Sequence, residues 1–223
     1  STDYLTLASN AALALGTADF TFECWVYATT TPSDVGIFEN RSNGLGTTTD
    51  GFTLGAYSSS VIRIYSAGVL IASSGTVYVN TWCHVAVVRS SGTWYLFING
   101  VSQGTSATSR NLTNTDAVIG AGRFNSNSTP SAFFPGYISN LRMVKGTALY
   151  TSNFTPSTTP LTAVANTSLL TCQSYNFLDN STNAFTVTKN GSTQISSYIP
   201  FTPGSSYATY GSCLLYTSPS PRD

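Results

Sequence analysis

Apolar and polar residues alternate along several short stretches of the chain, most clearly in Phe20–Tyr27, FTFECWVY. Every second residue from Phe20 to Val26 is apolar, which is the period of a β-strand. The opposite face carries Trp25 and Tyr27 as well as polar residues. This half-polar face is expected of a central strand that loops cover.

The stretch Trp82–Val101, WCHVAVVRSSGTWYLFINGV, predicts three strands joined by two tight turns. The first turn falls at Ser-Ser-Gly (90–92) and the second at Asn99-Gly100. Asn-Gly is the pair best suited to a type I′ turn, because both residues tolerate positive φ angles. The stretch therefore predicts a three-stranded antiparallel meander.

Further short stretches predict strands, and no stretch predicts a helix of ten residues, which together indicate an all-β sandwich. These strands are Tyr4–Leu7, Val35–Glu39, Gly51–Tyr57, Val61–Tyr65, Val69–Ala72, Val77–Val79, Ala117–Ile119, Tyr137–Val144, Thr167–Gln173 and Phe185–Thr188. Two long polar loops, Asn40–Asp50 and Gly120–Ser131, interrupt the pattern.

The composition supports a folded β protein that interacts with neither nucleic acid nor a membrane core. Its 223 residues are 41% hydrophobic and 13% aromatic, which argues against disorder. Only 8% are charged, against roughly 25% in an average domain, and nine basic residues balance nine acidic ones. The basic residues are scattered, so nucleic-acid binding is not expected. No apolar run approaches the roughly 18 residues of a membrane span.

We expect the chain to be part of a longer protein, because it opens with neither Met nor a signal peptide. Residues 1–155 are interpreted as one domain and 156–165, PSTTPLTAVA, as a linker. Residues 166–212 either complete the sandwich or begin a next unit. Residues 213–223, CLLYTSPSPRD, match a back-translated sequencing adapter and are interpreted as non-native.

Two motifs carry a family resemblance. The meander resembles the W-x-H-V-A…G…L-Y-(I/V)-N-G hairpin of laminin-G-like domains, and Phe133–Phe154 resembles their closing G-x-I-x-(N/D)-(L/V)-R strand. The continuation of this second motif resembles the form found in environmental phage structural proteins. The resemblance implies an all-β, antiparallel two-sheet jelly-roll sandwich of the concanavalin A-like type.

The same resemblance implies a non-enzymatic binding or structural module, located extracellularly or on a virion surface. We expect a phage tail or virion-surface protein that contacts host-surface glycans or another virion protein. A repeat unit of a secreted bacterial adhesin is the alternative, and a divergent glycoside hydrolase is a remote one. The opening Thr2–Leu7 and the closing Tyr207–Ser212 also suggest tandem copies.

The two long loops are the expected place of glycan binding, because loops on a rigid sandwich commonly carry function. Their candidate ligand-binding residues are Asn40, Arg41, Asn43, Asp50, Arg123, Phe124, Asn125 and Asn127. Trp25, Trp82 and Trp94 lie on predicted strands and are expected in the core rather than in a sugar platform.

Metal binding and catalysis find weaker support. Some laminin-G-like domains bind calcium, for which Asp34, Asp50 and Asp116 are the candidates, although no Asp-x-Asp-x-Asp run exists. A hydrolase would need paired carboxylates, and Glu23 and Glu39 form no such motif.

His84 and the cysteines are expected to be structural. Neighbouring strand residues point to opposite faces, so Cys83 and His84 cannot form a nucleophile pair. Cys24, Cys83 and Cys172 are expected as free thiols, with a disulfide left open. Cys213 falls in the segment interpreted as non-native.

Overall fold

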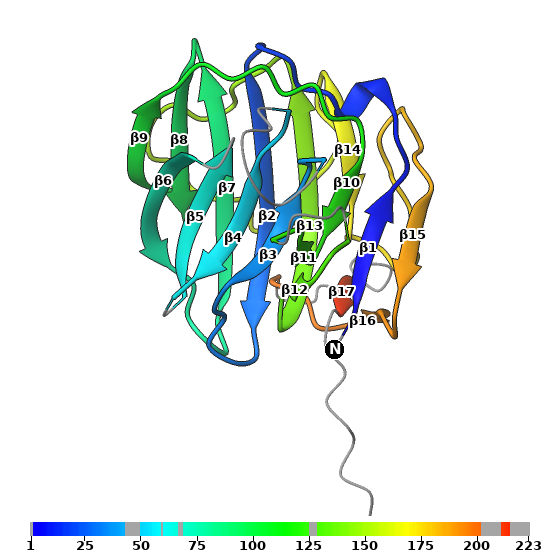
Figure 1. Ribbon diagram of the computed structural model, residues 1–223. Coiled ribbons are helices and arrows are strands. Elements are labelled where there is room, and N and C mark those ends of the chain that lie inside the picture. Colours follow the sequence, from blue (N-terminus) through cyan, green and yellow to red (C-terminus); the bar gives the residue numbers. More distant parts are fainter. Residues whose placement is uncertain are drawn as a thin grey trace, which may run out of the picture.

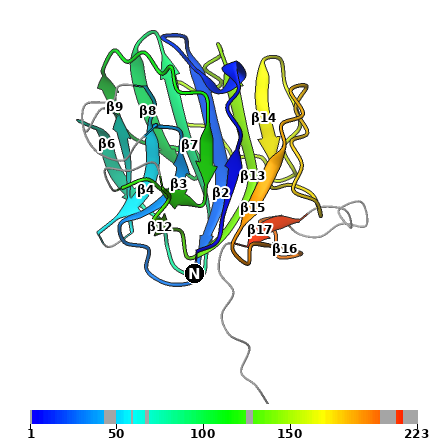
Figure 2. The ribbon, with the colours of Figure 1, turned by 45° about the vertical axis from the view of Figure 1, so that its right-hand side comes forward.

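The computed structural model describes residues 2–42, 50–58, 60–66, 69–124, 129–201 and 211–214. In this part of the chain, two largely antiparallel sheets pack face to face as a sandwich (Figures 1 and 2). The predicted all-β, two-sheet sandwich is confirmed.

The first sheet runs in the order β15 (Val187–Asn190), β1 (Tyr4–Leu7), β10 (Ala117–Ile119), β3 (Val35–Glu39), β4 (Thr53–Tyr57), β5 (Val61–Ser66) and β6 (Val69–Thr76). The short β11 (Ala121–Gly122) and β12 (Ala132–Phe133) pair with each other, and β12 also pairs with β3. The second sheet runs in the order β16 (Gln194–Ser196), β17 (Ser212–Leu214), β13 (Gly136–Lys145), β2 (Phe20–Ala28), β7 (Trp82–Ser90), β8 (Thr93–Ile98) and β9 (Val101–Ala107). β14 (Thr167–Thr171) also pairs with β13. A 3-10 turn, η1 (Ala11–Leu13), follows β1.

The core lies between the sheets and is rich in aromatic side chains. The alternating apolar face of β2 points into it, and Phe22 meets Phe38 of the first sheet with ring centroids 4.5 Å apart. Phe20 lies 5.5 Å from Phe52 and 5.3 Å from Trp94. Aromatic pairs of this kind add about 0.5–1.5 kcal/mol each beyond the burial of their surface.

The meander is confirmed as β7, β8 and β9, and the Asn99-Gly100 turn has the expected left-handed backbone. Asn99 and Gly100 have φ values of 49° and 75°, and the corresponding pair at the first turn, Ser91 and Gly92, has 49° and 80°. The second turn is also crowded, because a Cβ on Gly100 would lie 1.9 Å from the carbonyl oxygen of Phe154.

Two features of the strands differ from the predicted pattern. Val77–Val79 is not a strand, since only Val79 forms an isolated bridge, to Ala28, and Asn80 then turns the chain with a φ of 57°. The length of the edge strand β9 was not predicted, and the edge strand β16 was not predicted at all. Exposed edge strands carry polar residues on both faces and so lack an apolar period.

The C-terminal part of the chain lies in the same two sheets. β14 pairs with β13, and β15 pairs with β1. The predicted linker, residues 156–165, contains no strand. β17 overlaps the segment interpreted as non-native and pairs with β13 and β16.

Candidate functional site

The structure brings the two long loops together at the end of β3, around the fully buried carboxylate of Glu39. Arg41 donates to both of its oxygens, from Nε to Oε1 at 2.7 Å and from Nη2 to Oε2 at 2.8 Å. Thr53 Oγ1 donates to Oε2 at 2.6 Å, and the backbone N–H of Arg123 does so at 3.3 Å. Glu39 therefore links the first loop, β4 and the second loop.

A second ion pair extends this network. Arg123 donates to Asp116 from Nη2 at 2.9 Å and from Nη1 at 3.1 Å, and it also bonds the carbonyl of Arg41. Asn114 Nδ2 donates to the carbonyl of Asn40 at 2.7 Å. Burial alone would lower the pKa of Arg41, but its bonds to Glu39 outweigh burial and raise that pKa.

Of the five described loop residues predicted to contact a ligand, four make hydrogen bonds within the loops and to the sheet: Asn40, Arg41, Asp50 and Arg123. Asn40, Arg41 and Arg123 are only 0%, 4% and 5% exposed, and the Asn40 side chain accepts the backbone N–H of Phe52 at 2.8 Å. Asp50 accepts from Asn114 N through its carbonyl at 2.7 Å. The predicted Asn43, Asn125 and Asn127 lie outside the described residues.

Phe124 is different, because it joins a partly exposed group of aromatic rings on the outer face of the first sheet. It stacks on Tyr57 at 5.4 Å with an interplanar angle of 17°, and Tyr57 lies 5.2 Å from Tyr65. The Arg63 guanidinium carbon lies 5.2 Å from the centre of the Tyr57 ring. We call Tyr57, Arg63, Tyr65 and Phe124 the aromatic platform.

The sequence pattern did not identify three members of this platform, because their meeting depends on strand register. Arg63 lies opposite Gly55, and Tyr65 opposite Thr53. A Cβ on Gly122 would lie 2.3 Å from the Phe124 ring, so the ring lies directly over this glycine. Burial raises the pKa of the Tyr57 hydroxyl, which therefore stays protonated near neutral pH.

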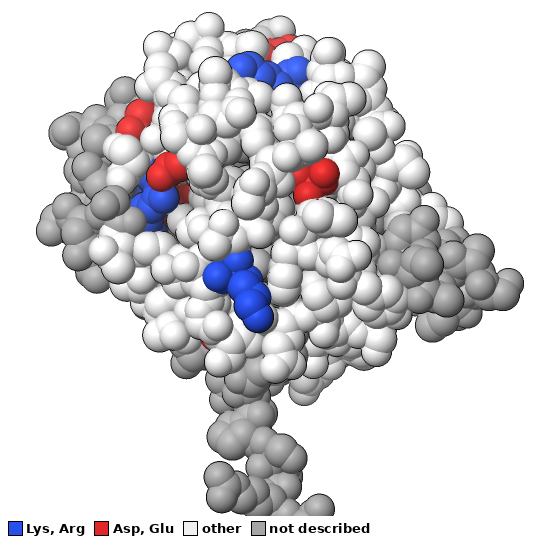
Figure 3. Space-filling model, turned by 90° about the vertical axis from the view of Figure 1, so that its right-hand side faces the viewer, with Lys and Arg blue, Asp and Glu red and all other residues white. Residues whose placement is uncertain are grey.

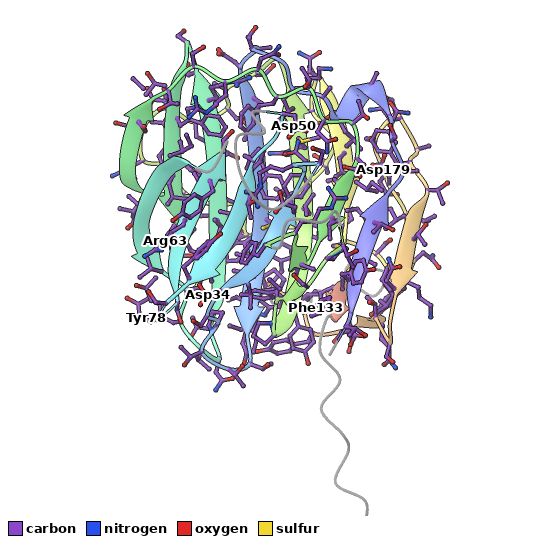
Figure 4. All side chains as sticks on the ribbon, in the orientation of Figure 1. Asp34, Asp50, Arg63, Tyr78, Phe133 and Asp179 are labelled. Atoms are coloured by element: carbon purple, nitrogen blue, oxygen red, sulfur yellow. The ribbon has the colours of Figure 1, made fainter. Side chains whose placement is uncertain are left out.

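The three aspartates predicted to bind calcium do not form one shell. Figure 4 shows Asp34 and Asp50 well apart on the first sheet, and the carboxylate of Asp116 is paired with Arg123. The described residues contain no group of three or more His, Cys, Asp or Glu side chains placed to hold a metal ion. The described residues around these three aspartates therefore do not offer the set of oxygen ligands that calcium needs.

Glu23, the other acid considered for catalysis, lies on the second sheet, in a separate buried network. His84 Nε2 lies 3.1 Å from its Oε2, Arg142 Nε donates to Oε1 at 2.9 Å, and the Tyr150 hydroxyl donates to Oε2 at 3.1 Å. Burial together with Glu23 raises the pKa of Tyr150 to about 12. His84 thus has a structural partner, and Glu23 and Glu39 belong to different sheets.

The three tryptophans do not share one environment. Trp94 is fully buried, as expected, and its indole N–H donates to the carbonyl of Thr108 at 2.9 Å. Trp25 and Trp82 are only partly buried and line a cavity of about 450 Å³. The expectation of core packing was wrong for these two, because their side chains lie on the outer face of the second sheet.

The family described as the concanavalin A-like lectin/glucanases superfamily (Laminin_G_3) matches residues 1–151, so the chain belongs to this family. This confirms the resemblance carried by the meander and by the closing strand. No curated protein sequence matches the chain.

A solved structure of low sequence identity shows the same fold. A protein from Bacteroides ovatus to which carbohydrate binding has been ascribed is 13% identical with a TM-score of 0.59, and the match covers 85% of this chain and 57% of that one. The heptameric SAP-like pentraxin of Limulus polyphemus is 16% identical with a TM-score of 0.49, covering 66% and 71%. The chain thus spans little more than half of the Bacteroides protein. No helix in the described part of the chain has the length and apolar character of a membrane crossing.

Proposed function

We propose that the chain is a non-enzymatic, lectin-like module that binds glycans on the aromatic platform. The observation that carries this proposal is the partly exposed stack of Tyr57 and Phe124 with Arg63 over the Tyr57 ring. Sugar rings present apolar C–H faces that pack on aromatic rings, and their hydroxyl groups accept hydrogen bonds from guanidinium groups. The family membership of the chain agrees with this chemistry.

Two ion pairs of the loops, Arg41–Glu39 and Arg123–Asp116, favour binding by a preformed surface. Glu39 and Arg123 connect the two loops from below, so Phe124 is anchored through its neighbour in sequence. A preorganised surface loses less conformational entropy on binding. The described parts of the loops thereby act as a fixed frame.

The placement of the acids supports a binding role rather than hydrolysis. A glycosidase needs two carboxyl groups about 5–9.5 Å apart, on either side of one glycosidic bond. Glu39 accepts from Arg41 and Thr53, whereas Glu23 accepts from Arg142 and Tyr150 on the other sheet. Neither carboxylate is available to a sugar in this arrangement.

The proposed setting is a phage tail or virion-surface protein that contacts host glycans, with a secreted bacterial adhesin as the alternative. The face in Figure 3 shows few charged side chains among the described residues, and most of this surface is uncharged. Such a surface suits recognition by neutral hydrogen-bonding groups. Tandem copies in a longer chain would increase avidity for repeated host glycans.

Glycan-array binding of the full chain, displayed as a multimer, tests the proposal. Wild type is compared with Tyr57→Ala and with Tyr175→Ala, which removes an exposed tyrosine outside the platform. Selective binding that Tyr57→Ala abolishes and Tyr175→Ala keeps would support it. Absence of selective binding by the wild-type multimer, or equal binding by both variants, would contradict it. Arrays with calcium and with a chelator also test the calcium prediction.

A further inference from the structure

We infer that the cavity beside Trp25 and Trp82 is a second binding site, for a neutral saccharide, on the opposite face of the sandwich. This site shares no residue with the aromatic platform, so the inference does not depend on the proposed function. Two sites on opposite outer faces would let one copy of the domain bridge two glycan chains.

The cavity lies between the second sheet and a segment that crosses its outer face, residues 146–160, which we call the strap. Its volume of about 450 Å³ falls within the range of small-molecule sites, about 300–1,000 Å³. It is lined by Trp25, Trp82, Asn99, Thr155, Pro156, Ser157, Thr158, Pro200 and Phe201. None of these described residues carries a charge, and burying an unpaired charge against such a wall would be costly. The lining therefore selects a neutral ligand.

The two tryptophans present ring carbon to the cavity. Both indole N–H groups are buried and have no partner among the described residues, so the exposed part of each indole is apolar. Trp82 stacks on Tyr198 at 5.6 Å with an interplanar angle of 29°, and Trp25 meets Phe201 edge to face at 6.0 Å. Flat carbon surfaces of this kind pack against the C–H face of a pyranose.

The opposite wall supplies hydrogen-bonding groups. The hydroxyl-bearing Thr155, Ser157 and Thr158 line the cavity from the strap, and Asn99 lines it from the β8–β9 turn. The Ser157 hydroxyl donates to the carbonyl of Thr159 at 2.7 Å. The amide oxygen of Asn99 accepts the backbone N–H of His84 at 2.8 Å, which holds this side chain against β7. An apolar wall facing a hydroxyl-rich wall matches the two kinds of surface on a sugar ring.

The strap is fixed on the sheet, so the cavity is preformed. Tyr150 and Phe154 stack at 3.6 Å with an interplanar angle of 6°, and the Tyr150 hydroxyl bonds Glu23. The backbone N–H of Phe154 donates to the carbonyl of Gly100 at 2.9 Å. Ser102 N donates to the side chain of Asn153 at 2.9 Å, immediately before the lining residues.

Calorimetric titration of the full chain tests this inference. The probes are linear neutral trisaccharides of glucose, galactose, mannose and arabinose, with trigalacturonate as the charged counterpart. We expect at least one neutral trisaccharide to bind and trigalacturonate not to compete for its site. Loss of stacking on Trp82 in Trp82→Ala should weaken that binding about tenfold.

Two further variants separate the possible outcomes. Tyr57→Ala, which removes the platform on the other face, should leave binding in the cavity unchanged. Thr158→Asp, made in this Tyr57→Ala background, places a charge at the exposed rim without touching the sheet, and it should abolish the remaining neutral binding even if Trp82→Ala fails to fold. The inference is overturned if no neutral trisaccharide binds, or if binding survives in the double variant with Tyr57→Ala and Thr158→Asp. It is also overturned if binding disappears in Tyr57→Ala, a result that would assign the sugar to the platform and leave the proposed function intact.

Discussion

Replacing Glu23 with Gln tests whether the buried network under the strap holds the second sheet together. The Glu23 side chain is 2% exposed, and the guanidinium of Arg142 lies 2.5 Å from its Oε1. Gln keeps the shape of the side chain but removes the charge opposite Arg142. The guanidinium then remains buried without an opposite charge, although it keeps the bond from Nη1 to the carbonyl of Thr162 at 2.8 Å, and the amide oxygen of Gln still accepts from it.

The expected loss of stability is large. Removing one partner of a buried ion pair costs about 3–5 kcal/mol, and the hydrogen bonds that Arg142 retains favour the lower end, about 3 kcal/mol. With a urea m-value of roughly 2–3 kcal/mol/M, the unfolding midpoint should fall by about 1 M or more. Asp34→Asn, at an exposed acid of the first sheet, is the matched control and should change stability by less than about 0.5 kcal/mol. A loss below about 1 kcal/mol in Glu23→Gln would refute the reasoning.

The stability that Glu23→Gln loses should become smaller as the pH falls. Burial alone would raise the pKa of Glu23, but the bonds from His84 and Arg142 outweigh burial and hold it below its usual value. The ionised carboxylate therefore stabilises the fold above its unfolded pKa of about 4.3, and this contribution is lost as the pH falls through the lower folded value. Urea midpoints of wild type and Glu23→Gln should thus converge below about pH 4. A constant gap from neutral pH to pH 3 would contradict this account.

Two other predictions follow from the turns and from the ion pairs. Gly100→Ala should lower the thermal midpoint more than Gly92→Ala, because both residues have positive φ but only the Cβ at Gly100 collides with Phe154. The control should lose about 1–2 kcal/mol from its backbone alone, and equal losses in calorimetry would refute the collision. A chelator should leave the thermal midpoint of wild type unchanged, because Asp116 is paired with Arg123. A clear fall in the midpoint on chelation would instead reveal a bound cation.

The fold could be predicted where hydrophobic alternation and turn chemistry agree. The alternation of β2 determines which face of that strand is buried, and the Asn99-Gly100 turn determines the register of its hairpin. Both follow from local residues alone. The edge strand β9 was less predictable, because its residues are largely exposed and show no apolar period. Val77–Val79 failed for the opposite reason, since its apolar residues have strand character but no neighbouring strand to pair with beyond one bridge.

The candidate sites were less predictable, because they join residues far apart in sequence. The sequence identified Arg41 and Arg123 as polar loop residues, but their burial depends on the meeting of the loops around Glu39. Phe124 was identified as a candidate from the sequence. Its partner Tyr57 was not, because its place in the platform depends on the register of β4 and β5. The cavity beside Trp82 could not be predicted, because one of its walls is the strap. The strap has no strand pattern that would place it on the sheet.

The most direct test of the central claim, that the aromatic platform binds glycans, is an amide NMR titration of the full chain with a glycan selected on the array. The account predicts the largest saturable shifts at Tyr57, Arg63 and Phe124, and their disappearance in Tyr57→Ala. Shifts confined to other parts of the chain, or none at saturating glycan, would contradict it.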